Sequence, residues 1–171
     1  MAVCYLKNLQ ILNLSNNLIE TFPKNLSPKC FPSLQQINLN HNKIKDIPSI
    51  LRFFNHLHTI LISNNQLQNI QEISKNDFPS LKFLDISSNQ IVEILNEFSV
   101  HFSKLEVLNI SNNKIENLPL NLGLLENLKN LDISGNPILN INQELIMKCS
   151  SSLIEFLKSC SEEFLPKKKN S

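Results

Sequence analysis

Apolar and polar residues follow one another in the stretch LEVLNISNNKIENLP, residues 105–119, in an order that no single helix or strand keeps. Leu105, Leu108 and Ile110 are apolar, and the next apolar residue, Ile115, comes only after a polar run. An amphipathic helix would repeat its apolar residues every three or four positions, and a half-buried strand would alternate strictly. The stretch therefore predicts a short strand that ends in a turn.

The same pattern occurs six times along the chain. The copies begin at Leu9, Leu34, Leu57, Leu81, Leu105 and Leu128, with spacings of 25, 23, 24, 24 and 23 residues. Each copy has an Asn near its middle, at Asn17, Asn42, Asn65, Asn89, Asn113 and Asn136. A repeat of this size cannot bury its apolar side alone, so the copies are expected to stack and share one elongated core.

Within one copy, alternate strand residues face opposite sides. Leu108 and Ile110 are two residues apart and point toward the predicted core, whereas Val107 and Asn109 point to the other side. Stacked parallel strands lie about 4.8 Å apart, so six strands make a face roughly 24 Å wide. The Asn column falls where the chain leaves each strand. Its carboxamides are expected to pair with turn backbone, and the loss of one should cost about 1 to 3 kcal/mol.

The repeat L-x-x-L-x-L-x-x-N-x-L resembles that of leucine-rich repeat proteins, from about Leu6 to Ile141. This resemblance implies an α/β fold: a leucine-rich repeat solenoid with a curved parallel β-sheet on its concave face and an irregular or short helical convex side. On this interpretation, residues 1–141 form six leucine-rich repeats, residues 142–165 a helical C-terminal cap, and residues 166–171 a basic, disordered tail.

The segment after the last repeat predicts a helix that closes the solenoid. Ser152 and Glu155 have the spacing of a capping box at a helix start. Apolar residues then recur at helical spacing, at Leu153, Phe156, Leu157 and Cys160. The segment resembles the closing element of intracellular repeat proteins of the Ras-group and Roco-like type. Asn142 stands where that element has Pro, and Cys149 where it has Gly.

Two features of the sequence bear on context. Only five residues precede the repeat that starts at Leu6, which leaves the core edge beside Leu9, Leu12 and Leu14 without cover. Either the chain is a piece of a longer solenoid, or this edge associates with another copy. The N-terminal residues include no long apolar run, and the four cysteines are scattered rather than clustered as in disulfide-bonded caps. These patterns favour a cytoplasmic location.

Candidate chemistry is scarce in this sequence. His56 and His58 are close together but have no acidic or cysteine partner at metal-ligand spacing, and Cys149 has no local catalytic signature. The chain has 2 glycines and a net charge of +1, which argue against a phosphate-binding loop and against nucleic acid. We interpret the three lysines at 167–169 as a solvated tail, and we expect no membrane association. The prediction is a protein that is not an enzyme and needs no cofactor.

The strand residues that face away from the core form the predicted binding surface. Their first column is Ile11, Gln36, Thr59, Phe83, Val107 and Asn130, and their second is Asn13, Asn38, Leu61, Asp85, Asn109 and Asp132. Both columns vary, whereas a third column is nearly all serine and is expected to serve the turn. Leu61, Phe83 and Val107 should form one apolar patch beside Asp85. The predicted partner-binding site comprises Phe83, Leu61, Val107, Asp85, Thr59 and Asn109.

These predictions favour an interaction module, either a scaffold or a regulatory adaptor, that binds a protein partner on its concave sheet. The resemblance to Ras-group and Roco-like proteins implies a small GTPase, a kinase or a phosphatase subunit as the partner. A second hypothesis is that the chain is the leucine-rich repeat segment of a larger signalling enzyme, such as a Roco-like GTPase or kinase or a ubiquitin ligase.

Overall fold

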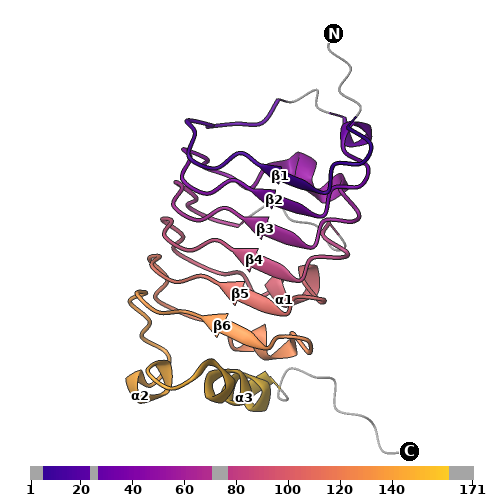
Figure 1. Cartoon of the computed structure of the whole chain (residues 1–171). Coiled ribbons are helices and arrows are strands. Elements are labelled where there is room, and N and C mark those ends of the chain that lie inside the picture. The colour runs from indigo at the N-terminus through magenta and orange to yellow at the C-terminus, as the bar shows by residue number, and fades with distance from the viewer. Residues whose placement is uncertain (1–5, 24–26, 71–76, 162–171) are drawn as a thin grey trace, which may run out of the picture.

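The protein is described here by a computed structural model that covers residues 6–23, 27–70 and 77–161. Within these residues, six parallel strands of three residues each form one sheet, in the order in which they occur along the chain (Figure 1). They are β1 Ile11–Asn13, β2 Gln36–Asn38, β3 Thr59–Leu61, β4 Phe83–Asp85, β5 Val107–Asn109 and β6 Asn130–Asp132. The α/β solenoid predicted from the repeat pattern is therefore confirmed.

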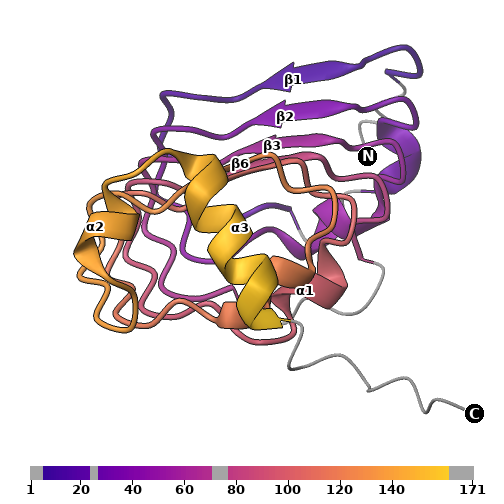
Figure 2. The same ribbon diagram turned by 90° about the horizontal axis from the view of Figure 1, so that it is seen from below.

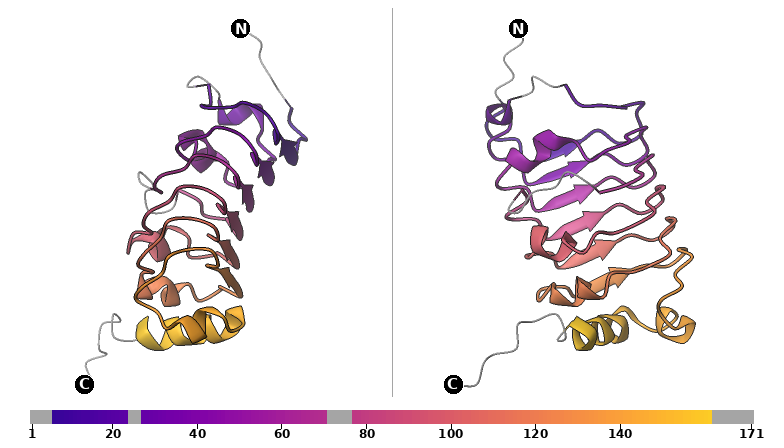
Figure 3. Two further views of the ribbon diagram at one scale, coloured as in Figure 1. Left: turned by 90° about the vertical axis from the view of Figure 1, so that its left-hand side faces the viewer. Right: turned by 180° about the vertical axis from the view of Figure 1, so that it is seen from behind.

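The strands line one side of the stack, and the connecting segments form the other side (Figure 3). The connections carry short helical turns, which are η1 Pro28–Cys30, η2 Ser49–Phe53, α1 Phe98–His101 and η3 Leu120–Leu124. Two helices follow β6, namely α2 Gln143–Ile146 and α3 Ser150–Ser161. Seen from below, α3 runs across the C-terminal end of the stack, from the strand side toward the connections (Figure 2).

The core follows from the alternation within each strand. Leu84 and Leu108 are the middle residues of β4 and β5, and both side chains are completely buried. Their register pairs them directly, so apolar side chains from successive strands stack in a continuous row. On the convex side, the Phe102 ring packs against Phe78 and Phe98, with ring centroids 5.6 and 4.5 Å apart. These three rings form one aromatic cluster on the convex side.

The Asn column joins neighbouring repeats. The Nδ2 of Asn65 donates to the carbonyl oxygens of Leu39, Ile62 and Ser63, at 3.0, 3.2 and 3.0 Å. Its Oδ1 accepts a hydrogen bond from the backbone N–H of Ile44 in the preceding repeat, at 3.0 Å. The same arrangement recurs at Asn42, Asn89, Asn113 and Asn136. The expected pairing with turn backbone is confirmed, and it also extends across the repeat boundary.

Helix α3 packs against η3 and β6 through its buried Leu153, Ile154 and Leu157 side chains. The approach to η3 is very close at Gly123, where a Cβ atom would overlap the backbone of Leu157. Only glycine, which has no Cβ, lets the two segments come this near. Gly123 therefore sets how closely α3 fits under the last repeat.

The start of α3 corrects one sequence prediction. The helix begins at Ser150, so Ser152 lies inside it and the capping box from Ser152 to Glu155 is wrong. The reason is a tertiary contact: the Oγ of Ser150 accepts a hydrogen bond of 2.6 Å from the backbone N–H of Leu131 in β6. Further upstream, Asn142 caps α2 by accepting a 2.8 Å hydrogen bond from the N–H of Glu144. The tail predicted at 166–171 lies outside the described residues.

The N-terminal end of the sheet has less cover than its interior. Leu9, Leu12 and Leu14 are half-buried, whereas Ile37 and Leu39, the equivalents of Leu12 and Leu14 in the next repeat, are buried. This difference agrees with the expected open edge.

Candidate functional site

The predicted site residues lie at the ends of three adjacent strands on the concave side (Figure 1). Their register pairs Thr59 with Phe83 and Phe83 with Val107. In the second column it pairs Leu61 with Asp85 and Asp85 with Asn109. The sheet therefore brings together Phe83, Leu61, Val107, Asp85, Thr59 and Asn109.

These six side chains are only partly exposed, which differs from the open patch expected from the sequence. Strands in the sheet are close neighbours, so each side chain covers the flanks of the next in its row. More exposed apolar side chains occur elsewhere: Leu18 is 76% exposed, Leu139 75% and Phe53 57%. Phe83 and Val107 thus form a half-covered apolar pair in the first column, and Leu61 lies in the second column, where its register partner is Asp85.

The serine column holds the side chains of the second column in place. The Oδ1 of Asp85 accepts hydrogen bonds from the N–H and the Oγ–H of Ser87, at 3.0 and 2.7 Å. Asp132 has the same two contacts with Ser134. The expectation that the serines serve the turn is confirmed. In addition, they fix the direction in which each carboxylate points across the concave face.

A row of alternating charges, which the repeat pattern did not predict, borders the site. The two oxygens of Glu106 bind different lysines, with Lys129 Nζ at 2.6 Å and Lys82 Nζ at 3.0 Å. The hydrogen bonds from Lys129 and then Lys82, followed by their positive charges, lower the pKa of Glu106 to about 2. The signal was available, because these three residues each precede a first-column residue by one position. The column one position before the first concave column therefore contains all three charged residues.

A hollow of about 460 Å³ lies at the C-terminal end of the concave face. Phe83 and Val107 form part of its lining, together with Asp132 in β6. Lys148, from the segment that joins α2 to α3, and Ser150, the first residue of α3, also line it. The sequence could not predict this hollow, because it depends on how the closing helices sit against β6.

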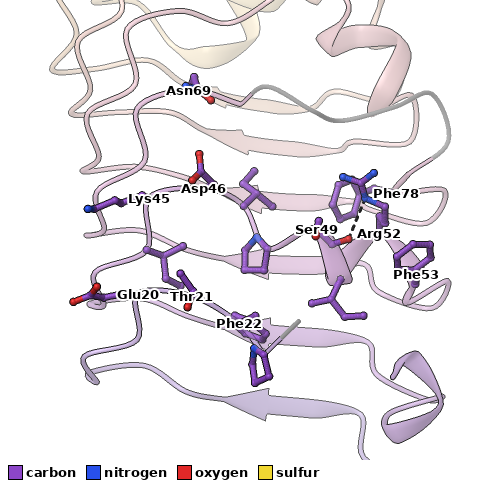
Figure 4. Close-up of a pocket in the computed structure, with 15 residues that line it drawn as sticks. Glu20, Thr21, Phe22, Lys45, Asp46, Ser49, Arg52, Phe53, Asn69 and Phe78 are labelled. Atoms are coloured by element: carbon purple, nitrogen blue, oxygen red, sulfur yellow. Dashed lines mark hydrogen bonds between the residues drawn. The ribbon is translucent and has the colours of Figure 1, made fainter. Parts of the chain in front are cut away.

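A second and larger hollow, of about 670 Å³, lies on the convex side among the connections of the first repeats (Figure 4). Phe22, Phe53 and Phe78 contribute aromatic lining. Arg52 lies at its edge, where its Nε donates a 3.0 Å hydrogen bond to the carbonyl of Ser49 and its guanidinium pairs with Asp77 at 3.5 Å. No candidate residue from the sequence falls in this hollow.

The remaining sequence candidates bring together no further site. Among the described residues, no three or more His, Cys, Asp or Glu side chains lie where they could hold a metal ion. Cys149 is exposed just before α3, and hydrogen bonds from Ser151 and Ser152 lower the pKa of its thiol to about 7. None of the helices in the described part of the chain is long and apolar enough to cross a membrane.

Comparisons with known proteins agree with this architecture. The family model described as "Leucine rich repeat" matches residues 55–115 and 79–138, and the model "Leucine Rich repeats (2 copies)" matches residues 7–52. The human PH domain leucine-rich repeat-containing protein phosphatase 1 is 26% identical over 139 residues. This match covers 81% of the chain but only 6% of the phosphatase.

Two solved structures are similar at 27% identity. One is an internalin from Listeria monocytogenes, with a TM-score of 0.59. The match covers 84% of this chain and 46% of the internalin chain. The other is the ectodomain of the Arabidopsis thaliana receptor kinase GASSHO1/SCHENGEN3 in complex with CASPARIAN STRIP INTEGRITY FACTOR 2. Its TM-score is 0.60, and the match covers 74% of this chain and 15% of the receptor chain.

Proposed function

We propose, from the premise that this chain belongs to the leucine-rich repeat proteins, that it is an interaction module that binds a protein partner on its concave sheet. The observation that carries the proposal is the row formed by Thr59, Phe83 and Val107, which the strand register makes continuous across three strands. A row of this kind gives an aromatic side chain a central place in a contact surface.

Residues on the two faces of the sheet have different roles. Core positions such as Leu84 are apolar in every repeat because they must pack, and the third column is nearly all serine because it holds the turns. The second column shares in the turns through its Asn and Asp side chains, whereas the first column has no such role and places Phe83 and Val107 between charged residues. A polar border around an apolar centre is how protein interfaces are built.

The similar structures support a proteinaceous ligand. The Arabidopsis receptor ectodomain is in complex with CASPARIAN STRIP INTEGRITY FACTOR 2, and its identity to this chain is 27%. We propose a protein or a peptide segment as the partner class, and no catalytic step in this part of the chain. A small GTPase, a kinase or a phosphatase subunit remains the proposed partner within that class, from the resemblance to Ras-group and Roco-like proteins.

A second candidate function is that of a leucine-rich repeat segment within a larger signalling enzyme. The observation in its favour is the similarity to the human phosphatase, of which the chain spans only 6%. Sequencing the full transcript would separate the candidates, because the second requires a catalytic domain in the same reading frame. The cytoplasmic location also stays a proposal. The similar receptor structure is an ectodomain, so localisation of the tagged natural protein is its test.

The experiment for the main proposal compares what the wild-type protein and two variants capture from native lysate. We expect a partner retained by the wild type to be lost by the variant Phe83→Ala, Leu61→Ala. The matched control is Phe53→Ala, Leu139→Ala, which removes the same side chains from exposed positions outside the concave sheet. Capture that survives the first variant and fails with the control would move the binding surface away from the sheet.

A further inference from the structure

The carboxylates of Asp85 and Asp132 carry charge that the fold does not use. The same position is Asn in three of the other repeats and Leu61 in the fourth, and Asn38 and Asn109 accept the corresponding turn hydrogen bond from the residue two positions later, each at 3.0 Å. A neutral amide therefore closes this turn as well as a carboxylate does. The negative charge at Asp85 and Asp132 must be explained by something other than the turn.

Both carboxylates also retain unused capacity to accept hydrogen bonds. In each, Oδ1 accepts hydrogen bonds from the N–H and the Oγ–H of the serine two residues later. Neither carboxylate forms an ion pair with another described residue, in contrast to Glu106, whose two oxygens are bound by two lysines. An ionised carboxylate has room for several donors, so Oδ2 of each Asp can accept from a ligand.

These two carboxylates lie near the apolar side chains of Phe83 and Val107. Asp85 lies two residues after Phe83 on β4, and Asp132 lines the same hollow as Phe83 and Val107. The register places Asn109 between the two carboxylates. Lys148 is the cation in the lining of the hollow, and it forms no ion pair with Asp132 within the described structure. The face thus has an apolar centre with acidic groups along one side.

We propose that this part of the concave face takes an extended segment of the partner in which a bulky apolar residue adjoins an arginine or lysine. The inference rests on the proposed function and specifies its ligand. The apolar side chain packs in the hollow of about 460 Å³ against Phe83 and Val107. The cationic side chain reaches Oδ2 of Asp132 in the lining of the hollow, where charge-assisted hydrogen bonds are stronger than neutral ones, and Asp85, two strands away in the same column, adds a second attractive charge.

The opposite charge sign is disfavoured on the same face. Of the cations near this face, Lys82 and Lys129 are both engaged by Glu106, which leaves Lys148 for an acidic ligand. Such a ligand would also meet Asp132 in the lining of the hollow and Asp85 in the same column, and like charges at an interface reduce affinity. Selection between basic and acidic segments is therefore the property that this geometry predicts.

The test is selection of a displayed library of random peptides on the purified full chain, followed by titration of the selected peptides. We expect enrichment of an apolar residue next to arginine or lysine. The variant Asp85→Asn, Asp132→Asn should bind these peptides about tenfold more weakly, since charge-assisted contacts are lost while the turns are kept. The control Asp46→Asn, which removes an exposed carboxylate on the convex side, should bind as the wild type does. Added salt should weaken binding to the wild type more than binding to the double variant.

The outcomes separate this inference from the proposed function. Selected peptides that lose affinity with Phe83→Ala but keep it with Asp85→Asn, Asp132→Asn would overturn the basic-segment inference and leave the concave site standing. Peptides whose affinity is also unchanged by Phe83→Ala would overturn both the basic-segment inference and the concave binding site. Enrichment of acidic or wholly neutral peptides, or of none, would contradict the inference directly.

Discussion

Replacing Asn89 by alanine tests how the repeats are held together. The Asn89 side chain is 8% exposed and connects two repeats through both ends of its amide. Its Oδ1 accepts the N–H of Leu67 at 3.0 Å, and its Nδ2 donates to Ile62 at 3.1 Å and to Ile86 at 3.0 Å. Asn89→Ala leaves the N–H of the buried Leu67 without that partner and removes donors from the carbonyls. A buried group without a partner costs about 1 to 3 kcal/mol, so the total loss should be about 2 to 4 kcal/mol.

The matched control is Asn17→Ala in the first repeat. Asn17 is exposed, and it donates only within its own repeat, to Leu14 and Ser15 at 3.0 Å each. Water can replace those bonds, so its loss should cost less than about 1 kcal/mol. The free energy of unfolding of each variant is measured by urea unfolding, monitored by circular dichroism and extrapolated linearly to zero urea. Equal losses for Asn17→Ala and Asn89→Ala would refute the reasoning, because the bonds between repeats would then contribute nothing beyond those within one repeat.

Three further predictions use the same measurements or simple chemistry. Leu84→Ala should lower the free energy of unfolding by roughly 2 to 5 kcal/mol, and Phe83→Ala by less than about 1 kcal/mol, because only Leu84 is completely buried; similar losses would contradict the assigned faces. Gly123→Ala should destabilise the protein by at least about 1 kcal/mol, since the new methyl group overlaps the backbone of Leu157; an unchanged melting curve would show that α3 can shift freely. The pKa of about 7 for Cys149 predicts that its alkylation rate rises through neutral pH, and that Ser151→Ala, Ser152→Ala moves this rise to higher pH, as followed by mass spectrometry; an unmoved profile would remove the serines as the cause.

The sequence predicted those parts of the fold that depend on local pattern. The alternation around Leu84 and Leu108 identified buried strand centres, and the repeated spacing placed the strands in register. The Asn column could be interpreted in the same way, because its hydrogen bonds involve the turn next to it. What repeats in the sequence repeats in the structure, so one copy informs the others.

The wrong prediction and the features that the sequence did not predict depend on tertiary contacts that occur only once in the fold, not in every repeat. The capping box predicted at Ser152 was wrong because α3 begins at Ser150, whose Oγ accepts a hydrogen bond from the N–H of Leu131 in β6. The spacing of residues in the sequence cannot predict this contact. The importance of Gly123 depends on the approach of α3, and the hollow beside Asp132 depends on the position of the closing segment. For the site, the pattern predicted which residues share a face, but it could not give their exposure.

Binding on the concave face can be measured by titration calorimetry of the captured partner against the wild type, Phe83→Ala and Phe53→Ala. Both variants remove one phenylalanine ring, from the centre of the concave sheet and from the convex side respectively. We expect folded Phe83→Ala to lose at least about 2 kcal/mol of binding free energy and Phe53→Ala to bind like the wild type. Wild-type affinity for Phe83→Ala, or a greater loss for Phe53→Ala, would contradict binding on the concave face.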